Sequence, residues 1–139
     1  MIMSLNWRVD HIGIAVTDLN QALSLYETMA NTAVTLREVI PEQGVEIAFL
    51  DTQGSKIELL ASTGPQSKLA AFLAKRGPGL HHICYEVTDI KSELQRLARE
   101  GFTLLDSTPR KGAGESKIAF IHPQSVHGVL TELCEYPRA

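Results

Sequence analysis

The sequence predicts an α+β fold in which two tandem βαβββ modules form a cupped mixed sheet. The first observation behind this prediction is an internal repeat. Three pairs of segments match in the same order: 11–19 with 82–90, 46–50 with 117–121, and 58–59 with 132–133. The first pair is identical at five of nine positions; the first two pairs are 71 residues apart and the third 74. The second observation is that hydrophobic periodicity and turn residues give each repeat the order strand, helix and three strands.

In the first repeat, residues 11–16 alternate in character, so we expect a strand with Ile12, Ile14 and Val16 toward the following helix. Thr17 or Asp18 can cap that helix at its N-terminus. Its apolar residues recur at helical spacing: Leu19, Ala22, Leu23 and Tyr26. Three short strands should follow, at 35–40, 45–50 and 56–61, because Pro, Gly, Asp and Ser separate these apolar runs.

The second repeat has the same pattern. A strand is expected at 82–87, and Asp89 should cap a helix that ends before Gly101. The inward residues of this helix are Ile90, Leu94, Leu97 and Ala98. The remaining strands are expected at 103–105, 117–121 and 129–134. The whole is predicted to be one domain, 8–136, made of repeats at about 8–62 and 79–136 that a helix at 67–76 links.

Composition narrows the classes of protein. The chain has 139 residues, 44% hydrophobic and 21% charged, which is ordinary for a globular protein and excludes disorder. A formal net charge of −3 gives no field that would attract nucleic acid or an anionic membrane. No apolar run approaches the length of a membrane span, and residues 1–8 lack a secretory pattern. We therefore expect a soluble cytoplasmic protein with neither nucleic acid nor membrane as partner.

The repeat also duplicates residues with metal-ligand chemistry. His11 and His82 are equivalent, and so are Glu58 and Glu132. Strand alternation places His11 beside the small residues Gly13 and Ala15, away from the helix. A single such His is more often a surface or core residue, and a single such Glu an edge residue, but both recur. The repeat therefore favours a His2Glu2 site, which suits Zn, Co, Ni, Fe or Mn.

The other histidines and the two cysteines are expected to be ordinary. Cys84 and Cys134 lie two residues past the second His–Glu pair and are too few for a disulfide scaffold. We expect both to be small buried packing residues. His81 should point away from its neighbour in the strand, and His122 and His127, which have no repeat partner, should lie in loops.

Seven stretches of the chain carry a resemblance to a known family. They are residues 10–16, 41–46, 56–60, 79–83, 109–114, 118–123 and 128–133. Together they resemble the vicinal oxygen chelate superfamily, which includes glyoxalase I, extradiol dioxygenases and bleomycin-resistance proteins. Within it, the chain is most similar to the methylmalonyl-CoA epimerases. Two positions depart from that family: Glu115 stands where a small residue is common, and His127 where glycine is usual.

This resemblance implies an activity, a ligand set and partners. The activity would interconvert (R)- and (S)-methylmalonyl-CoA by removing and returning the C2 proton through a metal-stabilised enolate. The implied ligands of a divalent metal ion are His11, Glu58, His82 and Glu132. Co2+ and Zn2+ are favoured, and Ni2+, Mn2+ and Fe2+ are also acceptable, although the sequence does not choose the native ion. The substrate would be an acyl-CoA, and the superfamily usually forms homodimers.

The resemblance also implies two catalytic bases, Glu46 and Glu132, one for each face of C2. Glu46 lies on a strand with Ala48 and Leu50 on its face, and we expect it to point into the cup. Its repeat partner is Lys117, so the two halves differ there.

Three further readings remain open at this point. Arg110 and Lys111 precede Gly112-Ala113-Gly114 and are either CoA phosphate contacts or a solvated basic turn. A glyoxalase I would use the same ligands on a glutathione hemithioacetal. A non-catalytic binding protein of the bleomycin-resistance type is also open, although the intact ligand set counts against it. An extradiol dioxygenase is disfavoured, because its facial triad leaves coordination positions open.

Overall fold

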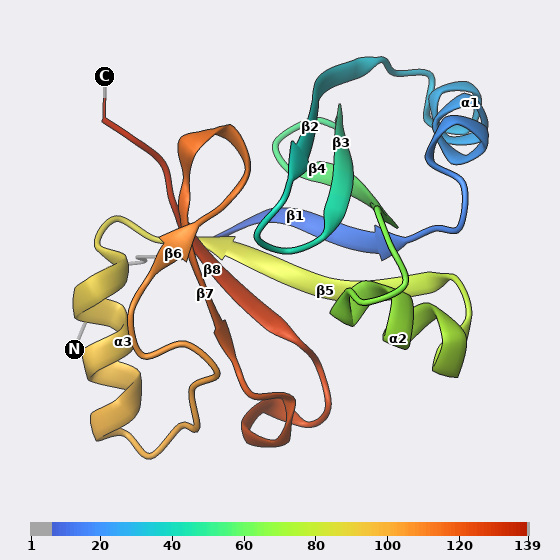
Figure 1. Ribbon diagram of the computed structural model, residues 1–139. Helices are drawn as coiled ribbons and strands as arrows, with labels where there is room; N and C mark the ends of the chain where they lie inside the picture. The colour runs from blue at the N-terminus through green and yellow to red at the C-terminus, as the bar shows by residue number, and fades with distance from the viewer. Residues whose placement is uncertain (1–6, 139) are drawn as a thin grey trace. The chain divides into compact units, whose positions relative to one another are not determined.

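The computed structural model describes residues 7–138 of the chain. Residues 1–6, which contribute to the expectation about secretion, lie outside the described residues. The first repeat consists of β1 (Arg8–Ala15), α1 (Leu19–Ala30), β2 (Val34–Ile40), β3 (Val45–Asp51) and β4 (Lys56–Ser62). Helix α2 (Lys68–Arg76) follows it (Figure 1). The second repeat consists of β5 (Gly79–Glu86), α3 (Ile90–Arg99), β6 (Arg110–Lys111), η1 (Ala113–Glu115), β7 (Lys117–Ile121), η2 (Pro123–Val126) and β8 (Thr131–Glu135).

The strands form an eight-stranded mixed sheet in the order β2-β3-β4-β1-β5-β8-β7-β6. In the first repeat, β1 pairs with β4 in parallel, while β2, β3 and β4 are antiparallel neighbours. In the second repeat, β5 pairs with β8 in parallel, and β6, β7 and β8 are antiparallel neighbours. The predicted α+β fold with a duplicated βαβββ order and a mixed sheet is confirmed.

The chain separates into two compact units whose boundaries fall inside strands rather than between the repeats. One unit is His11–His81, and the other combines the chain up to Asp10 with the chain from His82 onward. Strands β1 and β5 therefore each contribute residues to both units. The first residue on the C-terminal side of each boundary is a predicted ligand, His11 or His82.

The core of the His11–His81 unit forms where α1 packs on one face of β3 and β4. Its buried members are Val16, Leu19, Leu23, Ala48, Leu50, Leu59 and Ala61. Asp18 begins the helix, because its carboxylate accepts a hydrogen bond from the backbone N–H of Gln21 at 3.0 Å. Burial of each leucine stabilises the fold by about 1.5–3 kcal/mol. The predicted helix and its cap are confirmed.

The other unit has an equivalent core around α3. Its buried members are Val87, Ile90, Leu94, Leu97, Ala119, Ile121 and Leu133. Asp89 caps α3 by accepting from the N–H of Ser92 at 3.1 Å, as predicted. Gly101 has a φ of +92°, a conformation that glycine adopts without strain, and the helix ends just before it. Ser67 likewise caps the linking helix α2.

The prediction of a strand at 103–105 is wrong. Only Leu104 forms a bridge there, an isolated one to Ile121. Just beyond it, the side chain of Asp106 ends the pairing, because its Oδ2 accepts the hydrogen bond of the Phe120 N–H at 2.9 Å. Backbone hydrogen bonds flank the bridge, from the His122 N–H to the Thr103 carbonyl at 2.8 Å and from the Leu105 N–H to the Phe120 carbonyl at 2.9 Å, but a strand forms again only at β6.

Ile12 lies on the predicted face of β1, beside Ile57, which packs against the α1 core, but the helix does not cover Ile12. Ile12 is 39% exposed, whereas Ile14 packs against the α1 core and Val16 belongs to it. The apolar face of β1 is therefore shorter than the sequence alternation indicates.

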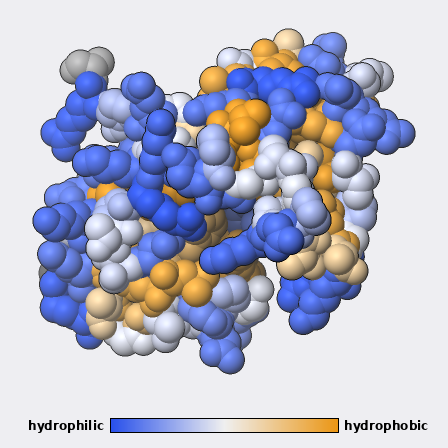
Figure 2. All heavy atoms as spheres, in the orientation of Figure 1, coloured by the Kyte–Doolittle hydropathy of each residue, from blue (hydrophilic) through white to orange (hydrophobic). Residues whose placement is uncertain are grey.

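Surface hydropathy is mixed, with hydrophobic residues scattered among hydrophilic ones (Figure 2). Large exposed apolar residues include Leu25, Met29, Val39, Leu80 and Leu105. Among residues 7–138, no helix is both long and apolar enough to cross a membrane.

One backbone position allows a stability prediction. His127 follows η2 with a φ of +60°, which costs a residue with a Cβ about 1 kcal/mol. We expect His127→Gly to raise the free energy of unfolding by about 0.5–1 kcal/mol, measured by urea denaturation. His127→Ala keeps the strain and should give no gain. Equal gains in both variants would mean that the imidazole, rather than the backbone, is responsible.

Candidate metal centre

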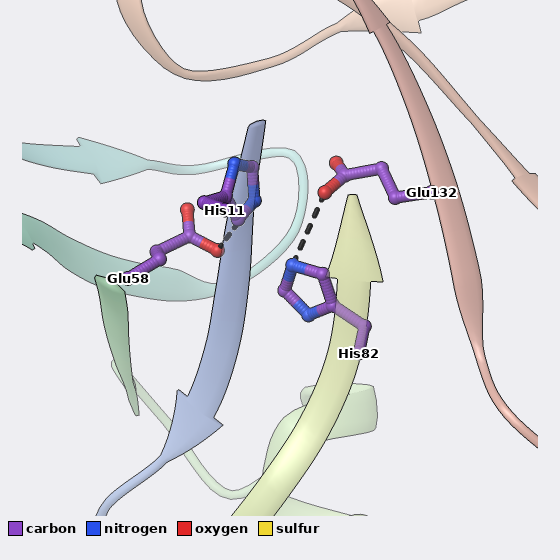
Figure 3. Close-up of side chains that lie close together, drawn as sticks. All are labelled: His11, Glu58, His82 and Glu132. Carbon is purple, nitrogen blue, oxygen red and sulfur yellow. Dashed lines mark ion pairs between the residues drawn. The ribbon is translucent and has the colours of Figure 1, made fainter. Parts of the chain in front are cut away.

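The first His–Glu pair lies on neighbouring parallel strands. His11 Nε2 of β1 is 3.4 Å from Glu58 Oε1 of β4, and the two side chains point toward each other (Figure 3). The register places Gly13 directly beside Glu58, so the position of β1 next to that glutamate carries no side chain and leaves room for the imidazole of His11. Both residues are buried. The expectation that small residues surround His11 on this face is confirmed by buried Gly13 and Ala15.

The second pair repeats this arrangement in the other unit. His82 Nε2 of β5 is 3.1 Å from Glu132 Oε1 of β8 (Figure 3). Here the register places Cys84, rather than a glycine, beside the glutamate. All four His and Glu residues are between 3% and 6% exposed.

The donor chemistry of these side chains fits a metal ion. Buried carboxylates are costly unless they are paired or coordinate a metal. Imidazole nitrogens and carboxylate oxygens are the ligands that Zn2+ and its first-row neighbours accept. Each buried His–Glu pair therefore offers one imidazole nitrogen and one carboxylate oxygen that could bind a divalent metal ion.

The strand faces in the first repeat correct the expectation for Glu46. Phe49 and Glu58 are cross-strand partners, so the face of β3 that accompanies Glu58 carries Val45, Ile47 and Phe49. Glu46 lies on the opposite face, with Ala48 and Leu50, and those two residues belong to the α1 core. The prediction that Glu46 points to the same side as the ligands is wrong.

The contacts of Glu46 agree with this placement. Its Oε2 accepts a hydrogen bond from Arg37 Nε of β2 at 2.9 Å, and Arg37 Nη1 also donates to Asn20 Oδ1 of α1 at 2.8 Å. The ion pair is partly exposed. Within Val45–Phe49, the face that accompanies Glu58 carries no titratable side chain.

The Arg110–Lys111 segment forms β6 and is exposed. Arg110 Nε is 3.2 Å from Asp106 Oδ1, and its guanidinium lies over the ring of Phe120 at 5.5 Å. Gly112 is required next to it, because a Cβ there would meet Ile118 Cγ2 at 2.5 Å. Contact of this segment with CoA stays a prediction.

The cysteines and the remaining histidines behave as expected. Cys84 and Cys134 are free thiols, buried around Ile118, and burial raises the pKa of the Cys84 thiol above its usual range. His81 packs its ring edge-on against Phe72. His122 lies outside the strands and caps η2, its Nδ1 accepting a hydrogen bond from the Gln124 N–H.

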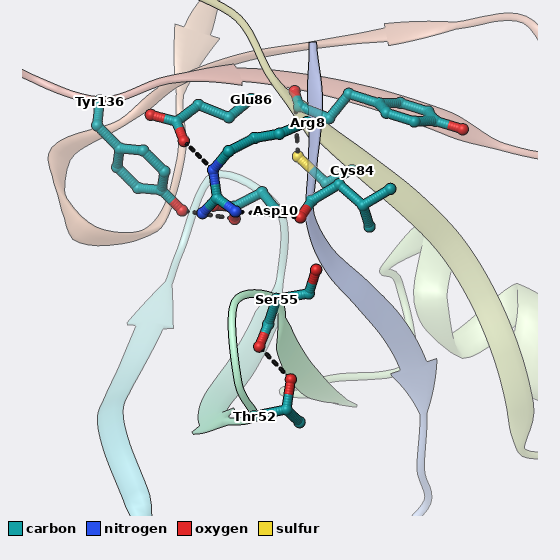
Figure 4. Close-up of polar contacts among 9 residues, drawn as sticks. Arg8, Asp10, Thr52, Ser55, Cys84, Glu86 and Tyr136 are labelled. Atoms are coloured by element: carbon teal, nitrogen blue, oxygen red, sulfur yellow. Dashed lines mark hydrogen bonds and ion pairs between the residues drawn. The ribbon is translucent and has the colours of Figure 1, made fainter.

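Sequence reasoning missed a polar network next to His11. Asp10 is fully buried; Tyr136 donates its hydroxyl to Asp10 Oδ2 at 2.7 Å, and Arg8 Nη2 lies 3.6 Å from Oδ1 (Figure 4). Arg8 also donates to Glu86 at 2.8 Å. Burial raises the pKa of the Tyr136 hydroxyl, so it stays a neutral donor. Duplication could not reveal Asp10, because its equivalent in the second repeat is His81.

Comparison with known proteins gives consistent relatives. The sequence model of the Glyoxalase/Bleomycin resistance protein/Dioxygenase superfamily matches residues 10–120. The ethylmalonyl-CoA/methylmalonyl-CoA epimerase of Cereibacter sphaeroides is 39% identical over 128 residues, which are 91% of this chain and 96% of the relative. The crystal structure of methylmalonyl-CoA epimerase from Mycobacterium tuberculosis aligns with a TM-score of 0.90 and 37% identity, over 94% of this chain and 88% of that one.

A further structure, a methylmalonyl-CoA epimerase in complex with methylmalonyl-CoA and NH4+, aligns with a TM-score of 0.90 and 38% identity, over 95% of this chain and 96% of that one. These relatives do not favour the glyoxalase I or bleomycin-resistance alternatives. The chain belongs to the glyoxalase/bleomycin resistance protein/dioxygenase superfamily and, within it, to the methylmalonyl-CoA epimerase family.

Proposed function

We propose that the protein interconverts (R)- and (S)-methylmalonyl-CoA by removing the proton at C2 and returning it to the other face. The observation that carries this proposal is the duplicated, buried His–Glu pair in a chain of the methylmalonyl-CoA epimerase family. Removal and return of the C2 proton requires a positioned acid–base side chain, a role that the buried carboxylates of these pairs can take.

We further propose that His11, Glu58, His82 and Glu132 bind one divalent ion together, with Co2+ or Zn2+ favoured and Ni2+, Mn2+ and Fe2+ acceptable. Two imidazole nitrogens and two carboxylate oxygens, all buried, support this ligand set. When bound, the ion would supply Lewis-acid stabilisation of the negative charge that develops on the enolate.

Of the two bases that the family resemblance implies, Glu46 and Glu132, we propose that Glu132 acts as one. Its buried carboxylate can take up the C2 proton from one face of the carbon, and the imidazole of His82 lies 3.1 Å from it. A base for the opposite face is also needed. Glu58 is the carboxylate at the equivalent position of the first repeat, and we propose it for that role in place of Glu46. A positioned acid–base group is typically worth about 10²–10⁴-fold in rate.

The Glu46→Gln variant tests whether Glu46 or another residue, which we propose to be Glu58, is the second base. Because Glu46 faces α1 and pairs with Arg37, we expect kcat to stay within about threefold of wild type, since an exposed ion pair is worth about 0–1 kcal/mol. The measurement is the steady-state epimerisation rate with the metal-loaded enzyme. Arg37→Ala, which breaks the same ion pair, is the matched control. A loss above 100-fold in Glu46→Gln alone would restore Glu46 as a base.

The partners and organisation that follow from this function are also proposals. We infer an acyl-CoA substrate whose phosphates contact Arg110 and Lys111, which are exposed and basic. Charge reversal at both positions should raise KM for the thioester, and an unchanged KM would exclude this contact. We also propose a cytoplasmic homodimer whose residues 8–136 fold as one domain. A dimer mass in light scattering and a single calorimetric transition are the expected results.

The first test of the function is proton exchange. Metal-loaded protein is incubated with methylmalonyl-CoA in D2O, and deuterium entering C2 is followed by NMR beside a chelator-treated sample. We expect exchange with interconversion of the two epimers only in the metal-loaded sample. Absence of exchange in metal-loaded protein would overturn the assignment, and the glutathione hemithioacetal of methylglyoxal would be the next substrate tested.

A further inference from the structure

Each His–Glu pair has a phenylalanine as its immediate neighbour. Phe49 of β3 is the cross-strand partner of Glu58, and Phe120 of β7 is the cross-strand partner of Glu132. The two phenylalanines are 71 residues apart and therefore occupy equivalent positions of the repeat. The duplication that marks the ligands thus extends to an apolar residue.

Each ring also contacts the histidine of its pair. The ring centroids of His11 and Phe49 are 5.1 Å apart with planes at 74°, and those of His82 and Phe120 are 6.2 Å apart with planes at 85°. Both are edge-to-face arrangements, which aromatic rings prefer over direct stacking. The imidazole has a broad range of χ2 angles in isolation, and such a contact narrows that range.

A cation covers the ring in each half. Lys56 Nζ lies 5.7 Å from the centroid of Phe49, and Arg110 Cζ lies 5.5 Å from that of Phe120. Lys56 is the residue beside His11 in the β1–β4 register, while Arg110 belongs to β6. These two cations do not occupy equivalent positions of the repeat. The same arrangement of cation, Phe, His and Glu therefore occurs in both repeats. Because the two cations come from non-equivalent positions, simple duplication of the sequence does not account for the whole arrangement.

We propose that Phe49 and Phe120 are positioning residues that hold the imidazoles of His11 and His82 in the orientation a metal ion requires. The inference rests on the metal site of the proposed function. Each phenyl ring limits rotation of its imidazole and, as the neighbour of the glutamate, keeps water from that side of the pair. Outer partners that orient metal ligands typically contribute about 10–100-fold to metal affinity, and we expect an effect of that order here.

The chain contains a matched control for this arrangement. Phe72 of α2 contacts the ring of His81 edge-on, with centroids 4.8 Å apart and planes at 78°, and Arg76 lies over Phe72 at 5.6 Å. This trio has the same cation, phenyl and imidazole groups but does not belong to a His–Glu pair. Phe72→Leu therefore removes an equivalent ring without touching the proposed ligands.

The experiment titrates Co2+ into metal-free wild type, Phe49→Leu, Phe120→Leu and Phe72→Leu, following heat by calorimetry and the visible absorption of bound Co2+. We expect Kd to rise by about 10–100-fold in Phe49→Leu and Phe120→Leu, with a changed Co2+ spectrum. Phe72→Leu should bind like wild type. Phe120→Tyr keeps the ring and should restore both the affinity and the spectrum. Circular dichroism and urea denaturation establish that each variant is folded.

The outcomes separate this inference from the proposed function. Wild-type Kd and spectrum in both Phe49→Leu and Phe120→Leu would overturn the positioning role and leave the metal site intact. An equal loss in Phe72→Leu would also overturn it, because the effect would then be general. Wild-type protein that binds Co2+ but exchanges no C2 proton would overturn only the epimerase assignment. If wild type binds no Co2+, the metal site and the positioning role both fail.

Discussion

Glu132→Gln should lower kcat for C2 proton exchange by about 10²–10⁴-fold, the usual contribution of a positioned acid–base group. The substitution preserves the shape of the side chain and one oxygen near His82, but an amide cannot accept the C2 proton. The measurement is deuterium incorporation by the metal-loaded variant, with Co2+ affinity determined in parallel. Parallel affinity data separate loss of the base from loss of the ion.

The matched control for Glu132→Gln is Glu46→Gln, the same chemical change on the α1 face of the first repeat. We expect a large loss in the first variant and a small one in the second. Near-wild-type exchange in a Glu132→Gln variant that still binds Co2+ would remove Glu132 from the proton transfer. Failure of that variant to bind Co2+ would identify Glu132 as a ligand. Its role as a base would then be tested by proton exchange in Glu132→Asp, which keeps a carboxylate.

Duplication explains why so much of the candidate site was predictable. A single histidine at the start of a strand carries little information, but His11 and His82 recur with Glu58 and Glu132 in matching positions. Local signals were equally effective for two of the helices, since Asp18 and Asp89 act as the N-caps that the sequence predicts. These features depend on nearby residues or on the repeat, and both are visible in the sequence.

The orientation of Glu46 was not predictable in the same way, because it depends on which face of β3 receives the helix. Adjacent residues of a strand point to opposite faces, so an error of one position reverses the assignment. Ala48 and Leu50, which share the face of Glu46, are apolar and would suit a buried face on either side of the sheet. Only the packing of α1 on Ala48 and Leu50 decides the question.

Interactions between distant side chains were likewise hidden. Asp106 ends the pairing of the segment before it, because its side chain accepts the hydrogen bond of the Phe120 N–H, fourteen positions away. Phe49 and Phe120 each contact a histidine, so an apolar side chain packs against a polar one. From hydrophobic periodicity alone, such a phenylalanine is predicted to be an ordinary core residue. Such contacts follow from register, which forms only when the strands pair.

His11→Ala and His82→Ala provide the test of whether the two pairs form one site. If all four residues hold one ion, wild type should bind one Co2+ per chain, and either substitution should weaken that binding by more than the roughly 10–100-fold expected for losing an outer partner. The two variants should behave alike, because each removes one imidazole ligand from the same set. Calorimetric titration gives both the stoichiometry and Kd.

Two separate sites, one for each pair, would give a different result. Wild type would then bind two ions per chain, and each variant would lose one and retain the other with unchanged Kd. His81→Ala is the matched control, since His81 neighbours His82 but packs against Phe72 instead of a ligand pair. A pair with two ligands holds an ion far less tightly than a complete set of four, so the His2Glu2 arrangement predicts the single-ion result. Proton exchange should disappear with the ion in both ligand variants, because neither repeat alone supplies the complete ligand set.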